Sequence, residues 1–457
     1  MSFSKSTEAG DDTGLADSGL ADTGVGDATV DSSGSGDAGG SGDTSEASGD
    51  ASALPVCPDG TELPNPYTPA GCGYAVTQPG GVTDIRRSCG TPGPDAAPQY
   101  VHIAFASDHA EHDVSVNWLT GEQTRLSVVR VGTSPDALTQ TFEGVSFAVA
   151  GVDRKRVVHE AHLCGLTPAT RYYYKVDGED PATAPGSFVT APERNATTPF
   201  TFVFSGDTRN VAGDPLWGQA LSAIATNIAP DFMVFSGDAV LLGSIQMQWD
   251  AWFTASAGPL RNIPFMPVNG NHDFLSLQYQ TEFTLPGNEA NYFFRYGNVL
   301  FIMLNDYPET DATMLDNGAR FLRQTISDNP DAQWRVLVNH RPFYSSALNH
   351  GSAADLQGSW LPIIDELGVD LVINGHDHNY ERSKPIRNGS IDTSGRGTVY
   401  VISAGLGAEL YDNGSNWWTE LSEKRETYCK VNVSGGTMDV TALRVDGTTA
   451  DHFVLTK

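Results

Sequence analysis

The stretch Asn374-Gly375-His376-Asp377-His378-Asn379-Tyr380-Glu381-Arg382 follows an apolar run, Val369-Asp370-Leu371-Val372-Ile373. This order predicts a buried strand that ends by presenting two imidazoles. Neutral imidazole is a common ligand of zinc, iron and related metals, and two histidines one residue apart can each face a different ion of a close pair. A His-x-His in a loop is, however, more often solvated or hydrogen-bonded than metal-bound. The interpretation therefore depends on whether other strands end in the same way.

Four other predicted strands lead into residues of the same kind. They are residues 201–205 before Gly206-Asp207, 232–236 before Gly237-Asp238, 265–268 before Asn269-Gly270-Asn271-His272-Asp273, and 334–338 before Asn339-His340. A single Gly-Asp after a strand is usually turn chemistry, because both residues favour turns. Five such endings are better explained by one shared site, since ligands of open α/β sheets bind outside the carboxyl ends of the strands. Two carboxylates, one amide oxygen and three imidazoles are enough for two divalent ions that share a carboxylate, an arrangement used for hydrolysis at phosphorus.

Composition divides the chain into four segments. Residues 1–55 are a tail rich in Gly, Ser and Asp, with 11 Asp or Glu against one Lys among the first 50 residues. Such a segment cannot bury enough apolar surface to fold, so we expect a disordered spacer. Calcium binding is the weaker interpretation of its Asp and Gly residues, because the full calcium loop with its closing Glu is absent. Residues 56–96 form a Cys/Pro/Gly-rich connector, residues 97–193 a predicted β-sandwich, and residues 199–457 a predicted α/β domain.

Alternating apolar and polar residues predict the sandwich. The runs lie at 101–105, 114–118, 126–131 and 172–176. Period-two alternation between turn residues is typical of such sheets. The segment 166–174 resembles the corner of a fibronectin type III-like domain, so its tyrosines are expected in the core. In the α/β segment, apolar stripes predict core helices at 216–228, with an N-cap at Asp214, and at 360–367, ended by Gly368.

Charge and apolar content exclude two function classes. The net charge of −29 argues against nucleic-acid binding, because surfaces that bind phosphate backbones are basic. No run approaches the roughly 18 consecutive apolar residues of a membrane span, so we expect no transmembrane segment.

The cysteines bear on the cellular compartment. They are Cys57, Cys72, Cys89, Cys164 and Cys429. Three lie in the connector, which suits a disulfide-clipped segment in an oxidising compartment, although unpaired structural thiols explain the pattern equally well. An odd number leaves at least one thiol free. The first five residues lack the apolar core of a secretory signal, so either the start is not the native one or the chain is not exported.

The ordered set of five strand endings resembles the calcineurin-like metallophosphoesterase superfamily. Within it, the sandwich ahead of the site and Tyr380-Glu381-Arg382-Ser383 after the histidine pair resemble purple acid phosphatases. The resemblance runs from about Pro98 to the C-terminus. It implies an all-β sandwich followed by a four-layer αββα domain, and a dinuclear metal-dependent phosphatase. Such an enzyme hydrolyses phosphate esters of small molecules by direct attack of metal-activated hydroxide, with no covalent phosphoenzyme. The resemblance also implies an extracellular, periplasmic or envelope-attached protein.

The resemblance assigns a role to each motif residue. Asp207, Asp238 and His378 would hold the first metal; Asn271, His340 and His376 would hold the second, with Asp238 bridging both. Asn271 and His272 would also face the substrate, and His272 or His350 would protonate the leaving alkoxide.

Two positions depart from the family pattern. Purple acid phosphatases have a tyrosine where this chain has Leu241, and the other branch of the superfamily has a histidine where this chain has Arg209. The first site thus has one ligand fewer and less negative charge. We therefore expect two divalent ions, Fe, Zn or Mn, or a weakly filled first site, and no purple colour. Arg209 is expected either to bind the substrate phosphate or to pair with a nearby acid.

A second function fits the same residues. The chain would then be a catalytically weak or inactive surface protein that binds metal or phosphate and keeps the scaffold without turnover. The substrate, the pH optimum and the oligomeric state stay open at the level of sequence.

Overall fold

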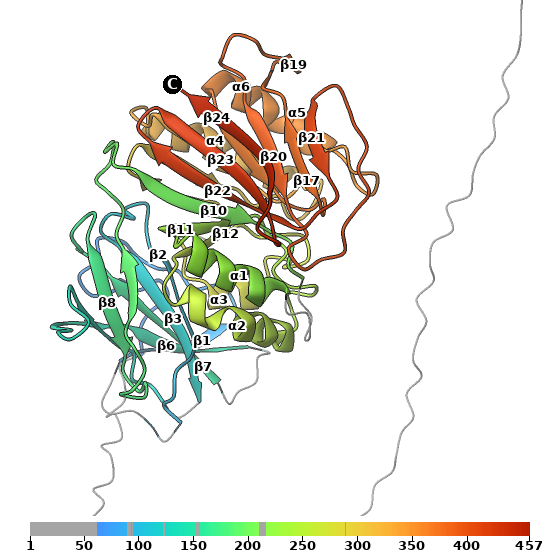
Figure 1. The fold of residues 1–457 in the computed structure, drawn as a ribbon. Coiled ribbons are helices and arrows are strands. Elements are labelled where there is room, and N and C mark those ends of the chain that lie inside the picture. The colour runs from blue at the N-terminus through green and yellow to red at the C-terminus, as the bar shows by residue number, and fades with distance from the viewer. Residues whose placement is uncertain are drawn as a thin grey trace, which may run out of the picture. The chain divides into compact units, whose positions relative to one another are not determined.

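The chain folds into a β-sandwich followed by an α/β domain, as the computed structural model shows (Figure 1). The structure describes residues 62–88, 93, 95–121, 124–150, 156–209, 216–287 and 289–457. The acidic tail, Cys57, Cys89 and the predicted N-cap Asp214 lie outside these ranges. The predicted fold class, a sandwich ahead of an αββα domain, is confirmed.

Two antiparallel sheets form the sandwich, with the orders β1-β6-β7-β3-β2 and β5-β4-β8-β9. Their strands are β1 (Val82–Arg87), β2 (Gln99–Phe105), β3 (Val114–Gly121), β4 (Val128–Gly132), β5 (Gln140–Glu143), β6 (Val145–Val149), β7 (Arg156–Leu163), β8 (Arg171–Val176) and β9 (Gly186–Val189). In β8, Tyr172 and Tyr174 are buried while Tyr173 between them is half-exposed, the alternation that the sequence predicts. Since β1 lies in the connector, that segment adds an edge strand to the first sheet.

The α/β domain contains two larger sheets. One has the order β12-β11-β10-β22-β23-β24 and the other β13-β14-β15-β16-β20-β17-β21. The strands are β10 (Phe200–Ser205), β11 (Phe232–Phe235), β12 (Phe265–Pro267), β13 (Tyr292–Tyr296), β14 (Val299–Met303), β15 (Trp334–Val338), β16 (Leu371–Asn374), β17 (Tyr380–Ser383), β20 (Val399–Ser403), β21 (Thr419–Glu423), β22 (Thr427–Ser434), β23 (Thr437–Arg444) and β24 (Thr449–Thr456), with a small hairpin of β18 (Ile386–Arg387) and β19 (Ser390–Ile391). The helices are α1 (Leu216–Asn227), α2 (Gln246–Leu260), α3 (Leu277–Glu282), α4 (Ala312–Asp328), α5 (Ala354–Ser359) and α6 (Leu361–Leu367).

The two larger sheets pack face to face between helices. Phe202 of β10 meets Phe301 of β14 edge to face, with ring centroids 5.1 Å apart. The preceding residue of β14, Leu300, points the other way and packs in a second cluster with α4, α5 and α6. On the outer face of the six-stranded sheet, Trp217 of α1 packs against Phe235 of β11. The result is four layers, helix, sheet, sheet and helix.

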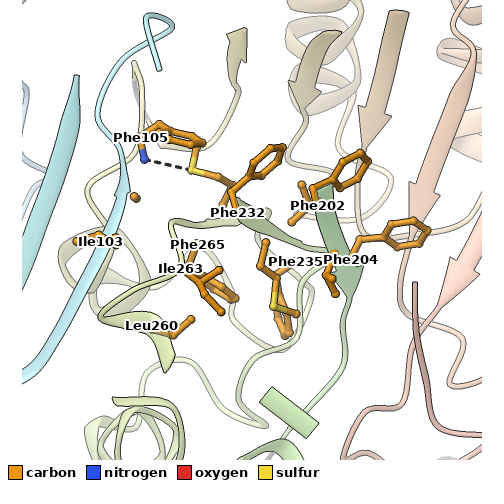
Figure 2. Packing of buried hydrophobic residues seen from close by; sticks show 14 of the residues in the cluster. Ile103, Phe105, Phe202, Phe204, Phe232, Phe235, Leu260, Ile263 and Phe265 are labelled. Carbon is orange, nitrogen blue, oxygen red and sulfur yellow. Dashed lines mark hydrogen bonds between the residues drawn. The ribbon is translucent and has the colours of Figure 1, made fainter. Parts of the chain in front are cut away.

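The sandwich shares a core with the α/β domain. Figure 2 shows Ile103 and Phe105 of β2 beside the aromatic cluster of β10, β11 and β12. The backbone N–H of Phe105 donates to Met266 Sδ at 3.3 Å, and the Phe105 ring lies 5.7 Å from that of Phe232. This continuous packing fixes the sandwich against the edge of the six-stranded sheet.

Both predicted core helices are present. The stripe at 216–228 corresponds to α1, and the stripe at 360–367 to α6. Gly368 ends α6 in the left-handed conformation, with φ 67°, which is favourable because glycine has no Cβ to clash. Among the described residues, no helix combines the length and the apolar character needed to cross a membrane.

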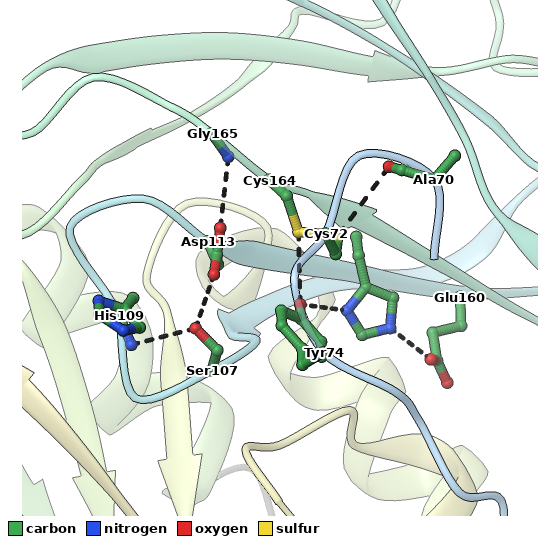
Figure 3. Close-up of a disulfide and its surroundings, with 10 residues drawn as sticks. Ala70, Cys72, Tyr74, Ser107, His109, Asp113, Glu160, Cys164 and Gly165 are labelled. Atoms are coloured by element: carbon green, nitrogen blue, oxygen red, sulfur yellow. Dashed lines mark hydrogen bonds and ion pairs between the residues drawn. A yellow bond between two sulfur atoms is a disulfide. The ribbon is translucent and has the colours of Figure 1, made fainter. Parts of the chain in front are cut away.

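A disulfide joins the connector to the sandwich (Figure 3). It links Cys72 to Cys164, which follows β7. The bond therefore does not close the connector on itself but fastens it to its neighbour. Within the described ranges the free cysteine is Cys429, which is buried in β22.

Candidate metal centre

Each of the five predicted strand endings lies at the carboxyl end of its strand. β10, β11 and β12 run parallel in one sheet, and β14, β15 and β16 run parallel in the other. Asp207, Asp238 and His376 follow three of these strands and adopt left-handed backbones, with φ 59°, 58° and 69°. Such backbones are uncommon away from glycine and gather at functional sites. The backbone N–H of His376 donates to Asp207, which connects the two sheets directly.

Four ligand atoms surround one point, the predicted second metal position. Asn271 Oδ1 lies 2.9 Å from His340 Nε2 and 3.1 Å from His376 Nδ1, and these two nitrogens are 3.3 Å apart. Asp238 Oδ1 lies 3.5 Å from His340 Nε2. Atoms about 2.1 Å from one ion, at tetrahedral or octahedral angles, stand about 3.0–3.4 Å from one another. The spacing therefore fits a metal ion.

The predicted first metal position has an unpaired nitrogen. His378 Nε2 is buried, has no hydrogen-bond partner among the described residues, and lies 3.4 Å from Asp207 Oδ1. A buried polar atom without a partner is costly in a folded protein. Single ligand atoms of Asp207, Asp238 and His340 all lie within 4.8 Å of one another. The side chains of Asp207, Asp238 and His378 supply atoms that fit an ion at the first position, and Asp238 also lies near His340 of the second position.

The second nitrogen of each imidazole is held by another group. Nδ1 of His340 donates to the carbonyl of Ser236 at 2.8 Å, and Nδ1 of His378 donates to the carbonyl of Glu409 at 2.5 Å. Because a carbonyl only accepts, both rings carry a proton on Nδ1 and turn Nε2 toward the other ligand atoms, so Nε2 is the atom that would meet a bound ion. The third ring, His376, presents Nδ1 to the site, and its Nε2 lies 2.9 Å from His350 Nδ1.

Glycines in the motifs leave room for the ligands. A Cβ on Gly270 would lie 2.2 Å from Asp238 Oδ1, and one on Gly375 would lie 2.5 Å from Asp207 Oδ2. No side chain can occupy either place. In the sequence these glycines look like ordinary turn residues. In the structure they are needed because the backbone at Gly270 and Gly375 passes close to the carboxylates of Asp238 and Asp207.

Opposite charges lie next to each other in the site. Burial raises the pKa of Asp238, but the charges of His340 and Arg209 outweigh burial and hold that pKa well below its ordinary range. Burial lowers the pKa of His340, whereas the negative charge of Asp238 raises it more, to about 10. Because a metal ligand must be a neutral imidazole, metal binding to His340 has to release a proton.

Asp273 shapes the loop that carries Asp238. Its Oδ2 accepts from the backbone N–H groups of Asp238 and Gly270, and its Oδ1 accepts from those of Ala239 and Val240, at 2.8–3.3 Å. The sequence motif contains Asp273, but sequence reasoning gives it no role.

The three predicted substrate residues differ in their placement. His272 lies beside Asp238, since its backbone N–H donates to Asp238 Oδ1 at 2.8 Å. His350 is exposed and touches the site through His376. Arg209 donates from Nε and Nη2 to Asp238 Oδ2, at 3.2 and 3.0 Å. The sequence left two partners open for Arg209, a substrate phosphate or a nearby acid. In this structure Arg209 pairs with an acid, Asp238.

Sequence reasoning missed Tyr411. Its ring stacks on that of His378, with centroids 4.2 Å apart and planes 17° apart. The loop that carries it follows β20, which runs parallel to β16 in the seven-stranded sheet. That strand ends in Ser403-Ala404-Gly405, without the Asp or His that marks the other five, so the ligand pattern did not reveal it.

Comparisons with known proteins agree with the fold and the order of the two domains. The family model described as "Calcineurin-like phosphoesterase" matches residues 200–380, and the one described as "Purple acid Phosphatase, N-terminal domain" matches residues 98–196. Purple acid phosphatase 18 of Arabidopsis thaliana is 28% identical over 354 residues, which cover 72% of this chain and 76% of that protein. An uncharacterised protein of Mycobacterium tuberculosis is 28% identical over 379 residues, which cover 68% of this chain and 70% of that one.

Two solved structures share the fold. A purple acid phosphatase from yellow lupin seeds aligns with a TM-score of 0.64 at 19% identity, over 79% of this chain and 75% of the other. The structure of PhoD aligns with a TM-score of 0.57 at 14% identity, over 80% of this chain and 90% of the other. At these identities the likeness concerns the fold alone.

Proposed function

Because this chain belongs to the calcineurin-like phosphoesterase family and has a purple acid phosphatase N-terminal domain ahead of it, we propose that it is a dinuclear metal-dependent phosphatase acting on small phosphate esters. The observation that carries the proposal is the convergence of six ligand side chains on two adjacent positions, one of them with a buried unpaired His378 nitrogen. Asp207, Asp238 and His378 would hold the first ion. Asn271, His340, His376 and the shared Asp238 would hold the second.

The bound ions would supply a water of lowered pKa and would neutralise charge on the phosphoryl group. The chain's own residues orient and protonate the substrate. His272 sits beside the bridging carboxylate, so it would contact the phosphoryl group, as would Asn271. His272 and His350 are the imidazoles outside the predicted ligand set at this site, and we propose one of them as the proton donor to the leaving alkoxide.

Both ions are proposed to be divalent, Fe, Zn or Mn. The first position has two carboxylates and one imidazole and, at Leu241, an apolar residue in place of a phenolate. Low ligand charge disfavours a trivalent ion. Iron-loaded protein should therefore show no phenolate-to-ferric absorption band.

The alternative function, a weak or inactive binder of metal or phosphate, is favoured by one contact. Arg209 occupies Asp238 Oδ2, an oxygen that the first ion would need. Metal analysis combined with activity separates the two proposals. Close to two equivalents of metal, with hydrolysis of an aryl phosphate, support the enzyme; one equivalent or less, without turnover, supports the binder. If His378→Ala loses the more weakly bound metal ion and His340→Ala loses the more tightly bound one, the first ion is assigned to the weaker position and the second to the tighter position.

We also propose that the protein works in an oxidising compartment, outside the cytosol or attached to the envelope. The Cys72–Cys164 disulfide supports this, because such bonds persist mainly in exported proteins. The acidic surface makes nucleic acid an unsuitable partner.

A further inference from the structure

The loop between Ala404 and Tyr411 is fastened to the ligands of the first metal position. The N–H of Ala408 donates to the carbonyl of Asp207 at 3.2 Å, and the N–H of Tyr411 donates to the carbonyl of His378 at 2.9 Å. In return, His378 Nδ1 donates to the carbonyl of Glu409. These bonds make the loop a fixed wall of the site.

The Tyr411 ring is held between two imidazoles. It stacks on His378, at 4.2 Å and 17°, and on His350, at 5.3 Å and 15°. Parallel packing with two rings removes most of the side chain's rotational freedom. The direction of the phenol hydroxyl is therefore set before any ligand binds.

Tyr411 lies beside Arg209, whose positive charge acts to lower the pKa of the phenol against the larger opposite effect of burial. The guanidinium donates to Asp238 Oδ2 at 3.0 and 3.2 Å. Tyr411, Arg209 and Asp238 are thus neighbours at the first metal position. The guanidinium side chain is 15% exposed, so it remains accessible from the solvent side.

Filling the metal positions changes what Arg209 can bind. Two cations on Asp238 would neutralise its carboxylate and compete for the oxygen that Arg209 now holds. An anion brought next to that oxygen is then the better partner, and guanidinium matches phosphoryl oxygens in charge and shape. Tyr411 stays beside Arg209, because its ring stacks on His378 and His350 and does not depend on Asp238.

We propose that Tyr411 and Arg209 form a clamp that donates hydrogen bonds to a terminal oxygen of the substrate's phosphoryl group and makes the site prefer phosphomonoesters to diesters. The inference rests on the proposed phosphatase function and assigns to it two residues that would set the preference between esters. A monoester has three terminal oxygens and up to two negative charges, whereas a diester has two terminal oxygens and one charge. If two terminal oxygens face the metal ions, a monoester still has a third terminal oxygen for the clamp to bind, whereas a diester has none.

Tyr411→Phe tests the clamp, because it deletes one oxygen and keeps the ring between His350 and His378. With an aryl phosphate monoester we expect kcat/KM to fall about tenfold or more, and with a bis-aryl diester less than about twofold. Inorganic phosphate should bind the metal-loaded variant about tenfold more weakly in calorimetry. Tyr173→Phe, which removes a half-exposed hydroxyl in β8 of the sandwich, should change none of these values.

Several outcomes would overturn the inference. Equal losses on both esters, or unchanged phosphate binding, would show that Tyr411 does not contact the phosphoryl group. A ferric absorption band present in the parent and absent from Tyr411→Phe would make the phenol a metal ligand instead. A parent protein that binds two metals and hydrolyses no ester would reject the proposed function, and the phosphate calorimetry would still decide on the clamp.

Discussion

Asp238 Oδ2 is the atom for which Arg209 and the proposed first metal ion would compete. In this structure Arg209 Nη2 lies 3.0 Å from it. Both groups are buried or nearly so, and solvent therefore screens their attraction less than at the surface. The occupancy of the first position should depend on this ion pair as much as on the missing phenolate at Leu241.

Arg209→Ala should raise the affinity of the first metal position. Loss of a positive charge next to Asp238 removes the competitor, so half-filling should need roughly tenfold less metal. Metal titration followed by elemental analysis measures this. Arg130→Ala, which breaks an exposed pair with Asp177 in the sandwich, is the matched control. A variant that needs more metal than the parent would contradict the prediction.

Asp273→Asn should damage the site without removing any predicted ligand side chain. Each Asp273 oxygen accepts from two backbone N–H groups, so either orientation of the amide sets its NH₂ against two donors. We expect a loss of roughly 2–4 kcal/mol in the free energy of unfolding, and weaker metal binding. Thermal unfolding and metal titration check it, with exposed Asp136→Asn as the control. Parent-like stability would show that the loop finds other acceptors.

The sequence allows candidate ligand residues to be chosen where their side chains follow predicted strands in a recognisable order. The six ligand candidates could be chosen because each follows a strand and has a ligand side chain. Tyr411 could not, since its role depends on stacking against His378, more than 30 positions earlier. The partner of Arg209 likewise depends on which of several acceptors its long side chain reaches, and spacing along the chain does not show that.

At the scale of elements, apolar runs located the strands that lead into the site. β10, β11, β12, β15 and β16 all begin and end within two residues of the predicted runs. The sequence did not show that β22 lies beside β10 in the same sheet. Antiparallel pairing between distant segments is set by tertiary packing, so the local periodicity of the sequence does not predict it.

α3 carries a buried acid where the α/β domain meets the sandwich. Burial raises the pKa of Glu282 from its ordinary value near 4.5 to about 7. Its carboxylate accepts from Gln246, and its backbone carbonyl is 2.6 Å from Nε2 of His102 on β2. The folded chain therefore holds the Glu282 proton more tightly than the unfolded chain does.

Glu282→Gln should stabilise the protein in a defined pH range. Because the pKa of Glu282 is raised in the folded state, its carboxyl group contributes to the free energy of unfolding fully below pH 4.5. That contribution is lost as the pH rises through 7. The neutral amide avoids that loss and still accepts from Gln246. At pH 8 the variant should be more stable by up to about 3 kcal/mol, and at pH 4 it should equal the parent. Denaturant unfolding across pH is the measurement, with exposed Glu143→Gln as the control. A difference independent of pH would refute the assignment.

At the scale of the whole molecule, the connector is tied to the sandwich by both covalent and polar contacts. Next to the Cys72–Cys164 bond, the hydroxyl of Tyr74 lies 2.8 Å from His162 Nδ1, and His162 Nε2 lies 2.5 Å from the buried Glu160 carboxylate (Figure 3). The disulfide closes 92 positions of chain. Cysteine spacing alone did not identify this pair, because five cysteines allow many pairings.

The double substitution Cys72→Ala/Cys164→Ala should lower the free energy of unfolding by about 2–4 kcal/mol. The variant frees the unfolded chain from a long closed loop, and calorimetry should show a lower Tm. Metal content should stay near that of the parent, because the bond lies in the sandwich and none of the ligand residues does. A Tm equal to the parent's would mean that the polar contacts and the edge strand β1 suffice.

The pairing of β10 with β22 has a consequence for synthesis. Phe204 on β10 lies opposite Cys429 on β22, more than 200 positions later. While the ribosome makes the intervening chain, β10 and its neighbours have an open sheet edge, which invites pairing with other chains. Asp207 emerges early, yet its sheet is incomplete until the last strands appear. The proposed metal centre should therefore be among the last features to form, and a nascent chain of this protein should depend on chaperones until its C-terminus is released.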